Sequence, residues 1–458
     1  MHLDDTIVAV ATPPGRGGIG VVRLSGPEAR AIAGPLLRLK SALEPGRALF
    51  GELLEPTSGE RIDEVVVTFF QKPHSYTTDD VVEISAHGAP VVLRHLVELC
   101  LARGARLAEP GEFTLRAFLN GRLDLTQAEA VRDLIESQTL YQAKVAAQQL
   151  EGALSRRLAP IKEKLVGLIA LLEAGIDFAE DDVAVLPDQQ IAHDIIQVRE
   201  PLAALAGTFA YGKVVHQGLT LAIVGRPNVG KSSLFNCLVE RERAIVTASP
   251  GTTRDLVSET VSLGGIPVRL VDTAGLRQAL DEAESIGIRK SMEALADADL
   301  VLVVLDASQP RAREDDELLA SVRERAHIAV ANKIDVGRQT SDVSKTGNRE
   351  LGTGNFLPTS AVTGEGIQQL RERILQHIRG EAGAPAESGF LTNARHQGLV
   401  QESLAALEAA AEAARNHIPH EMILLDLYTA LRPLDAITGQ TTADDILNRI
   451  FSSFCIGK

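Results

Sequence analysis

Short apolar runs alternate with polar residues through the first 118 positions. Four of these runs predict strands, at Ile7–Ala11, Gly20–Leu24, Glu64–Phe70 and Val81–Ser85. The apolar spacing of Pro90–Ala102, followed by Gly104, predicts a helix. This mixture predicts an α+β domain at the start of the chain.

The pattern changes at Thr126, where the chain becomes rich in Ala, Leu, Gln and Glu. Thr126 and Glu129 have the spacing of a capping box, so we expect a long helical stretch to open there. Pro160 is expected to interrupt the helix because proline lacks an amide donor. Helical sequence then resumes to about Gly175 and again over 188–211.

After Gly218 apolar runs alternate with helical segments. The runs are Leu219–Val224, Val268–Asp272, Leu300–Asp306, Ile328–Asn332 and Phe356–Thr359. This alternation is typical of an α/β domain with a mostly parallel sheet. Residues 337–355 read as a polar loop and 381–388 as a linker, and helical sequence resumes from Asn393.

Bulk properties narrow the class of protein. The chain has 458 residues, 45% hydrophobic and 23% charged, which is typical of a soluble protein with about three domains. It has no Trp and a net charge of −15, which disfavours aromatic-stacking RNA modules and an extended phosphate-binding surface.

The cysteines and the hydropathy pattern bear on the compartment. Cys100, Cys237 and Cys455 are too far apart to indicate a zinc site or a disulfide framework. The first residues lack the basic and apolar pattern of a signal peptide, and no apolar run is long enough for a membrane span. We therefore expect a cytoplasmic protein.

A phosphate-binding loop follows the first strand of the α/β region. Gly225 opens the sequence GRPNVGKS, which ends at Ser232. Backbone amides of such a loop and the helix start after it point at phosphate oxygens. Lys231 is expected to reach the β- and γ-phosphates, and the Ser232 hydroxyl to bind Mg²⁺. The nucleotide-contacting stretch comprises Asn228, Val229, Gly230, Lys231, Ser232 and Ser233.

Three later motifs complete a guanine-nucleotide site, each at the end of a predicted strand. The first is Asp272, Thr273, Ala274 and Gly275, the second is Asn332, Lys333 and Asp335, and the third is Ser360 and Ala361. Asp272 is placed for Mg²⁺ and Gly275 for the γ-phosphate. Asp335 can accept the two hydrogen bonds that guanine offers and adenine does not. Open α/β sheets bind ligands at this edge, so the sequence predicts a GTPase.

The residue that orients the attacking water is not obvious. Leu276 occupies the position where Ras-like proteins carry Gln. Asp281, Glu282 and Glu284 are acidic candidates nearby. Residues 251–255 (GTTRD) lie where a Mg²⁺-binding Thr belongs, and Asn228 either binds a monovalent cation or braces the loop.

Several blocks identify a family. They are DTIVAVATPPGRGGIGVVRLSG (4–26), SYTTDDVVEISAHG (75–88), GEFTLRAFLNGRLDLTQAEAV (111–131), GRPNVGKSSLFN (225–236), PGTTRD (250–255), DTAGLR (272–277), NKID (332–335) and FCIGK (454–458). The chain resembles the MnmE (TrmE) family of tRNA-modification GTPases along essentially its whole length. The N-terminal blocks and the FCIGK ending are specific to that family.

The resemblance implies a particular fold and partition. Residues 1–120 would be a folate-binding, aminomethyltransferase-like domain that also dimerises. Residues 121–215 and 381–458 would form a discontinuous helical domain, with a Ras-like P-loop GTPase domain inserted at 216–380. The implied partners are a second copy, the flavoprotein MnmG (GidA) and tRNA. The implied activity is K⁺-activated GTP hydrolysis that helps to add a carboxymethylaminomethyl or aminomethyl group to the wobble uridine.

The resemblance also implies site residues. Ser232 and Thr253 would hold Mg²⁺, and Asn228, Thr247, Ser249 and Thr252 would hold K⁺. Glu284 would position the attacking water. Arg23, Glu83, Arg122 and Lys458 would bind a 5-formyl- or methylene-tetrahydrofolate donor, and Cys455 would be the essential thiol. From its sequence context alone, Cys455 also reads as an apolar residue that packs into a core.

A second function class fits the nucleotide motifs equally well. A GTP-switched ribosome- or RNA-assembly factor would use the same site without modification chemistry. Such factors are expected to carry a basic RNA-binding module, and no segment here reads as one.

Overall fold

The computed structural model describes residues 4–177, 186–241, 258–272, 297–337, 356–380, 388–440 and 457. Its contacts divide the chain into two compact units. The first comprises Met1–Arg132, Gln149–Val185 and Ile418–Lys458, and the second comprises Asp133–Gln148 and Leu186–His417. The four-part partition expected from the sequence stays a prediction.

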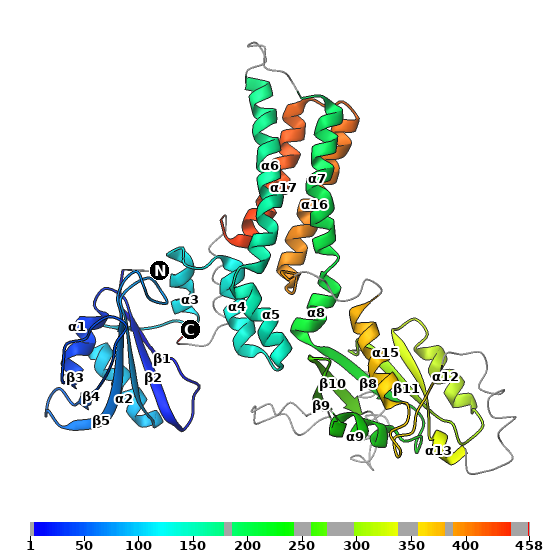
Figure 1. The fold of residues 1–458 in the computed structure, drawn as a ribbon, viewed down its shortest axis with the longest axis horizontal. Coiled ribbons are helices and arrows are strands. Elements are labelled where there is room, and N and C mark those ends of the chain that lie inside the picture. Colours follow the sequence, from blue (N-terminus) through cyan, green and yellow to red (C-terminus); the bar gives the residue numbers. More distant parts are fainter. Residues whose placement is uncertain are drawn as a thin grey trace. The chain divides into compact units, whose positions relative to one another are not determined.

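A seven-stranded sheet dominates the start of the first unit (Figure 1). Its strands are β1 Ile7–Val10, β2 Gly17–Ser25, β3 Leu37–Leu39, β4 Ala48–Leu54, β5 Arg61–Phe70, β6 Val81–Gly88 and β7 Arg106–Leu107. Their order is β3-β4-β5-β6-β2-β1-β7, and only the β1–β7 pair is parallel. The four predicted strands are confirmed, but β3, β4 and β7 were not predicted. Gly51 interrupts the apolar pattern of β4 because a Cβ there would lie 2.7 Å from the Arg38 carbonyl of β3.

Helices complete the first unit. They are α1 Ala29–Ala33, α2 Pro90–Ala102, α3 Glu112–Leu119, most of α4 Leu125–Glu136, α6 Ala153–Asp177 and α17 His420–Thr438. Helix α2 has the predicted bounds, and α1 and α2 cover one face of the sheet with a shared apolar core. Helix α17 packs along α6 (Figure 1).

Two sequence predictions about the helical region are wrong. The helix α4 is capped two residues earlier than expected: Asp124 accepts from the Gln127 amide and Gln127 accepts from the Asp124 amide. Thr126 and Glu129 lie inside the helix and are buried. Pro160 does not interrupt α6, because it lies on an exposed face where water can satisfy the carbonyl that loses its amide partner.

The second unit is built on a six-stranded sheet. Its strands are β8 Leu219–Val224, β9 Ser258–Leu263, β10 Ile266–Asp272, β11 Leu300–Asp306, β12 His327–Asn332 and β13 Leu357–Pro358, in the order β13-β12-β11-β8-β10-β9. Only β9, which was not predicted, pairs antiparallel. The mostly parallel sheet is therefore confirmed.

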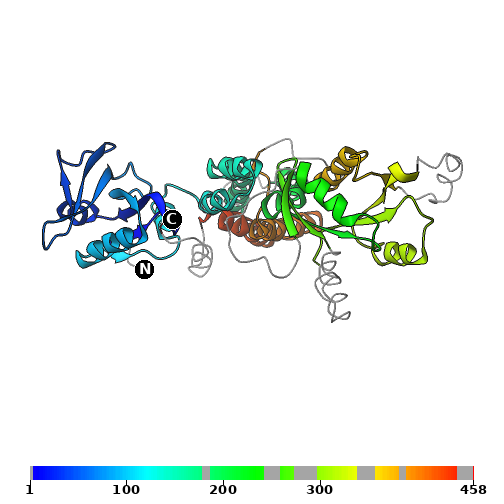
Figure 2. The same ribbon diagram turned by 90° about the horizontal axis from the view of Figure 1, so that it is seen from below.

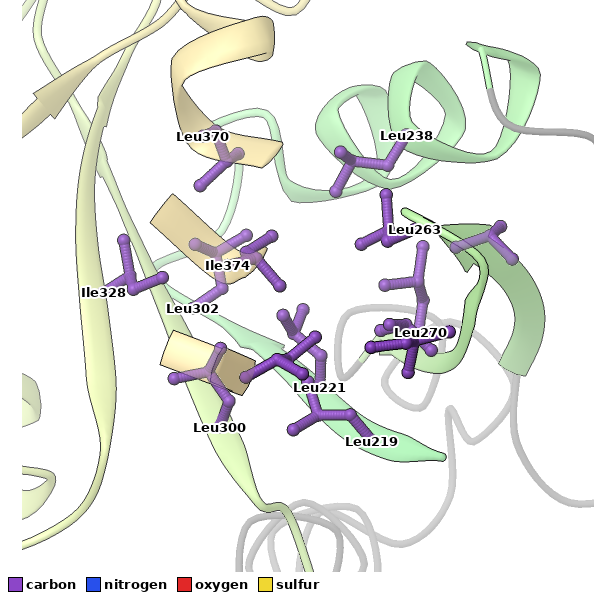
Figure 3. Packing of buried hydrophobic residues seen from close by; sticks show 14 of the residues in the cluster. Leu219, Leu221, Leu238, Leu263, Leu270, Leu300, Leu302, Ile328, Leu370 and Ile374 are labelled. Atoms are coloured by element: carbon purple, nitrogen blue, oxygen red, sulfur yellow. The ribbon is translucent and has the colours of Figure 1, made fainter. Parts of the chain in front are cut away.

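Helices lie on both faces of this sheet (Figure 2). The helices described in this unit are α5 Leu140–Leu150 for most of its length, α7 Asp188–Ala206, α8 Phe209–Gln217, α9 Lys231–Arg241, α12 Arg313–Ser321, α13 Ile334–Gly337, α15 Ile367–Arg379 and α16 Ala394–Arg415. Side chains of α9 and α15 share one apolar core with the sheet, and Leu370 and Ile374 of α15 lie near Leu302 (Figure 3). The core on the opposite face includes Val322, just after α12. All residues of β11 are buried, as expected for a parallel strand covered on both sides.

Hydropathy gives one further result. Within the described ranges, no helix combines the length and the apolar character that crossing a bilayer requires.

Candidate nucleotide and anion sites

Four parallel strands of the second unit end at the same edge. β8 leads into the Gly225–Gly230 loop, while β10, β11 and β12 end at Asp272, Asp306 and Asn332. Parallel strands bring their carboxyl ends together, so motifs far apart in sequence meet here. The predicted strand–loop–helix context of the first motif is confirmed, since α9 begins at Lys231.

The conformation of the Gly225–Gly230 loop is stabilised by hydrogen bonds from the adjoining Lys231 and by two residues with positive φ. The Lys231 ammonium is buried and donates to the Gly225 carbonyl at 2.9 Å and the Arg226 carbonyl at 2.7 Å. Asn228 and Gly230 have φ of 64° and 94°, the left-handed region. A side chain at Gly230 would collide with the Asn332 carboxamide, so only glycine fits. The first amides of α9 have no partner within the helix, which makes this loop suited to an anion.

Ser232 and Asp272 lie together at the start of α9. The Ser232 hydroxyl donates to the Asp272 carboxylate at 2.8 Å, and Asp272 is 3% exposed. A hydroxyl and a carboxylate beside a phosphate-binding loop are oxygen ligands of the kind that Mg²⁺ prefers. The two residues that the sequence assigned to Mg²⁺ chemistry on this edge are thus brought together.

The Asn332 side chain, at the end of β12, connects two loops. Its amide donates to the Val229 carbonyl at 3.0 Å, and its oxygen accepts from the Ala361 amide at 3.1 Å. Asn332 is 1% exposed, so it acts as a buried brace between the phosphate loop and the last strand. The Ala361 amide, which belongs to the third predicted motif, is therefore used by this brace. The Ser360 amide donates to the Glu365 carbonyl at 2.9 Å.

Lys333 and Asp335 lie on either side of the start of α13. The Lys333 ammonium donates to the Asn228 carbonyl at 2.5 Å and to the Asp306 carboxylate at 2.8 Å. The Asp335 Oδ1 atom is buried and accepts no hydrogen bond from the residues that the structure describes. A buried acceptor without a donor is unfavourable, so this oxygen is suited to a ligand that brings its own N–H groups. The base-reading role predicted for Asp335 fits this geometry.

Other predicted site residues lie outside the described residues. They are Thr247, Ser249, Thr252 and Thr253, then Thr273, Ala274 and Gly275, and finally Glu284, Cys455 and Lys458. Their predicted roles stay predictions. Val229 is buried beneath the loop, and Ser233 is exposed in the first turn of α9.

Sequence reasoning missed two acidic residues near this edge. Asp306 closes β11 and pairs with Lys333, as described above. Asp315 is 1% exposed and pairs with Arg226 of the phosphate loop at 2.7 Å. The signal for Asp306 was present, because it ends an apolar strand as Asp272 does. Nothing local marks Asp315, whose partner is 89 residues away.

A cavity of about 610 Å³ lies in the first unit. Its lining includes Tyr76, Glu83 and Arg122. Arg23 pairs with Glu83 at 2.7 Å and its guanidinium lies 5.6 Å from the centre of the Tyr76 ring. Arg122 lies 5.1 Å from the same ring and donates to the Ser75 carbonyl at 2.8 Å. The three described residues assigned to folate are therefore brought together around one tyrosine.

The charge balance of this cavity suits an anionic ring compound. Burial raises the pKa of Tyr76, so the phenol stays neutral and can face two guanidinium groups. The Arg23 guanidinium also donates to the Gly457 carbonyl at 3.4 Å, which places Gly457 next to Arg23. Two arginines against one glutamate leave a positive excess beside an aromatic surface.

Comparison with known proteins gives a consistent result. Family models match residues 6–122, described as "GTP-binding protein TrmE N-terminus", and residues 125–455, described as "MnmE helical domain". The "tRNA modification GTPase MnmE" of Koribacter versatilis is 68% identical and covers 100% of both chains. The protein of the same name from Aquifex aeolicus is 44% identical over 99% of this chain and 100% of its own.

Proposed function

Because this chain belongs to the family of tRNA modification GTPases named MnmE, we propose that it is a K⁺-stimulated GTPase that acts with MnmG on the wobble uridine of tRNA. GTP hydrolysis in tRNA modification is the activity of the family. Beyond this family activity, we propose four more specific features: activation by K⁺, action with MnmG, a tetrahydrofolate one-carbon donor and a homodimer. The proposed partition is a folate-binding domain at 1–120, a helical domain at 121–215 and 381–458, and a GTPase domain at 216–380.

The observation that carries the nucleotide part is the buried Asp335 Oδ1 atom, to which none of the described residues donates. It lies at the same sheet edge as the Gly225–Gly230 loop and the Ser232–Asp272 pair. Guanine would supply the missing donors, and Ser232 with Asp272 and Thr253 would hold Mg²⁺. Glu284 would then orient water, the role that Leu276 cannot fill.

Asn228 carries the proposed K⁺ site, with Thr247, Ser249 and Thr252. A cation beside the phosphates supplies the positive charge that an arginine finger supplies in other GTPases. Replacing K⁺ by Na⁺ at equal ionic strength should slow GTP turnover about 100-fold. Asn228→Ala should remove the difference between the two salts. Equal turnover of the wild-type protein in both salts would exclude the K⁺ site but not the GTPase.

Arg23, Glu83 and Arg122, with Lys458, carry the proposed folate site. A pterin could lie against the Tyr76 ring while the guanidinium groups bind the glutamate tail. The test is calorimetric titration of the full chain with 5-formyltetrahydrofolate. Absence of binding at millimolar ligand would remove the folate part. Cys455 is proposed as the thiol of the modification step.

The tRNA part is tested in cells. Mass spectrometry of tRNA after deletion of the gene should show loss of the modified wobble uridine, and the wild-type gene should restore it. The alternative, a GTP-switched assembly factor, predicts unchanged wobble uridine together with abnormal ribosomal particles. An Asp335→Asn gene that fails to restore the nucleoside would connect the modification to the nucleotide site.

A further inference from the structure

We propose that Asp306 is a positioning residue for guanine-nucleotide binding, which fixes Lys333 and, through Lys333, the backbone of Asn228. The inference rests on the proposed guanine site and adds a residue that none of its motifs contains. Asp306 ends β11, between the strand that precedes the phosphate loop and the strand that precedes Lys333.

Both carboxylate oxygens of Asp306 are used within the protein. Oδ2 accepts from the Lys333 ammonium at 2.8 Å, and Oδ1 accepts from the Ser308 amide at 2.9 Å and the Ser308 hydroxyl at 2.6 Å. The residue is 8% exposed. Burial alone would raise its pKa, but the bonds from Lys333 and Ser308 lower the pKa below its ordinary value. Asp306 is therefore a buried anion opposite the Lys333 cation.

Lys333 transmits this restraint to the phosphate loop. Its ammonium donates to the Asn228 carbonyl at 2.5 Å as well as to Asp306. Lys333 and Asn228 have φ of 67° and 64°, although neither is glycine. Such left-handed residues persist only where surrounding contacts hold them. The shared ammonium is one contact that joins both strained positions.

Removing the Asp306 charge should loosen both positions together. The Lys333 side chain is 31% exposed, and its four-carbon stem can turn its ammonium to water once the buried counter-charge is gone. The Asn228 carbonyl would then lose its donor. Because each Asp306 oxygen already accepts from a protein group, we expect the effect on nucleotide to pass through Lys333.

The alternative is a purely structural role, in which Asp306 stabilises the end of β11 through its bonds to Ser308. That role predicts a loss of stability without a specific loss of nucleotide. The positioning role predicts that Asp306 and Lys333 act as one unit, so their substitutions should not add. Non-additivity therefore separates the two roles.

The experiment measures release and affinity of a fluorescent GDP on the full chain for Asp306→Asn, Lys333→Met and the double variant. Asp306→Asn should weaken GDP about 10-fold, mainly through faster release. The double variant should bind within about two-fold of Lys333→Met alone. Asp316→Asn is the matched control: its side chain is 61% exposed and pairs with Arg311, and its GDP affinity should match wild type within about two-fold.

Unchanged affinity in Asp306→Asn, or effects that multiply in the double variant, would overturn the inference. If Asp306→Asn failed to fold, Lys333→Met would decide: unchanged GDP release in that variant would show that Lys333 transmits nothing, and faster release at a wild-type unfolding temperature would support the inference. A wild-type protein that bound no guanine nucleotide would instead remove the guanine site, and the inference with it.

Discussion

Glu112 in the first unit and Asp335 in the second both bury carboxylate oxygens, but their surroundings are opposite. Glu112 is 0% exposed and accepts from Arg106 at 2.5 Å, from Arg116 at 2.9 Å and from the Glu109 amide at 2.8 Å. Within the described part of the chain, Asp335 Oδ1 accepts from no group. The first carboxylate is satisfied by the fold, and the second is left to be satisfied by a ligand. Disrupting the first should therefore cost stability, and disrupting the second should cost binding.

Arg23, near the cavity of the first unit, is intermediate between Glu112 and Asp335. Arg23 is paired with Glu83, yet its side chain is still 17% exposed, and both Glu83 and Tyr76, which it contacts, line the cavity. Its charge both stabilises the sheet through Glu83 and is available to a ligand. We therefore expect substitution of Arg23 to have a modest effect on stability and a modest effect on ligand binding.

The largest effect is expected for Arg116→Met. Arg116 is 1% exposed and also pairs with Asp5, through the Asp5 side chain at 2.5 Å and its carbonyl at 2.7 Å. The substitution leaves Glu112 buried with less counter-charge and should lower the free energy of unfolding by about 3–5 kcal/mol. Urea unfolding measures the loss, and hydrogen exchange should locate it in β1, β7 and α3.

The matched control for Arg116 is Arg47→Met, which removes an exposed ion pair with Glu44. Both of its side chains are 61% exposed, so the change should stay below about 1 kcal/mol. An Arg116→Met loss as small as that of the control would show that the buried network is not what holds α3.

Asp335→Asn should show the opposite behaviour. Two charge-assisted hydrogen bonds to guanine are lost, and GTP affinity should fall about 100-fold while the affinity for XTP rises. The unfolding temperature without nucleotide should stay near wild type, because no protein bond to Oδ1 is broken. Competition binding with GTP and XTP measures the preference, and an unaltered preference would mean that the base lies elsewhere.

Arg23→Gln should weaken 5-formyltetrahydrofolate about 10-fold, a loss of about 1.4 kcal/mol. Its control is Arg38→Gln on the same sheet, since Arg38 also makes a cross-strand pair, with Glu52, but is 60% exposed and away from the cavity. Calorimetry on the full chain should find the control indistinguishable from wild type. Equal losses in both variants would point to general electrostatic attraction rather than a site.

The two regions also differ in what the sequence could predict. The nucleotide site could be predicted from the sequence because each motif follows an apolar strand. Parallel strands bring such positions together at one edge of the sheet. Arg23 and Glu83 are direct cross-strand partners in an antiparallel pair, which local sequence does not specify. Only the family resemblance grouped them. Asp315 was missed for the same reason, since its partner is distant in the chain.

Local rules failed where a stronger competitor lay nearby. Thr126 and Glu129 have capping spacing, but Asp124 and Gln127 have it too and form the reciprocal bonds. Pro160 breaks one helical bond, which the rest of the 25-residue helix α6 outweighs. Each error concerns only one or two hydrogen bonds, whereas the sheet order and the strand ends depend on many residues at once.

The smallest predicted effect is the pH dependence of the Glu112 contribution. Burial would raise the Glu112 pKa, but bonds from Arg106, the Glu109 amide and Arg116 bring it below the ordinary value of 4.5. A carboxyl whose pKa is lowered on folding stabilises the fold above its unfolded pKa, and this contribution is lost as the pH falls through the folded pKa. The wild-type advantage over Glu112→Gln should therefore be complete at pH 7 and shrink below about pH 4.5, by at most about 1.4 kcal/mol per pH unit. Urea unfolding of both proteins at several pH values measures the difference. An advantage that stayed constant into acid would mean that Glu112 acts through shape rather than charge, and the contrast with Asp335 would then lose its electrostatic basis.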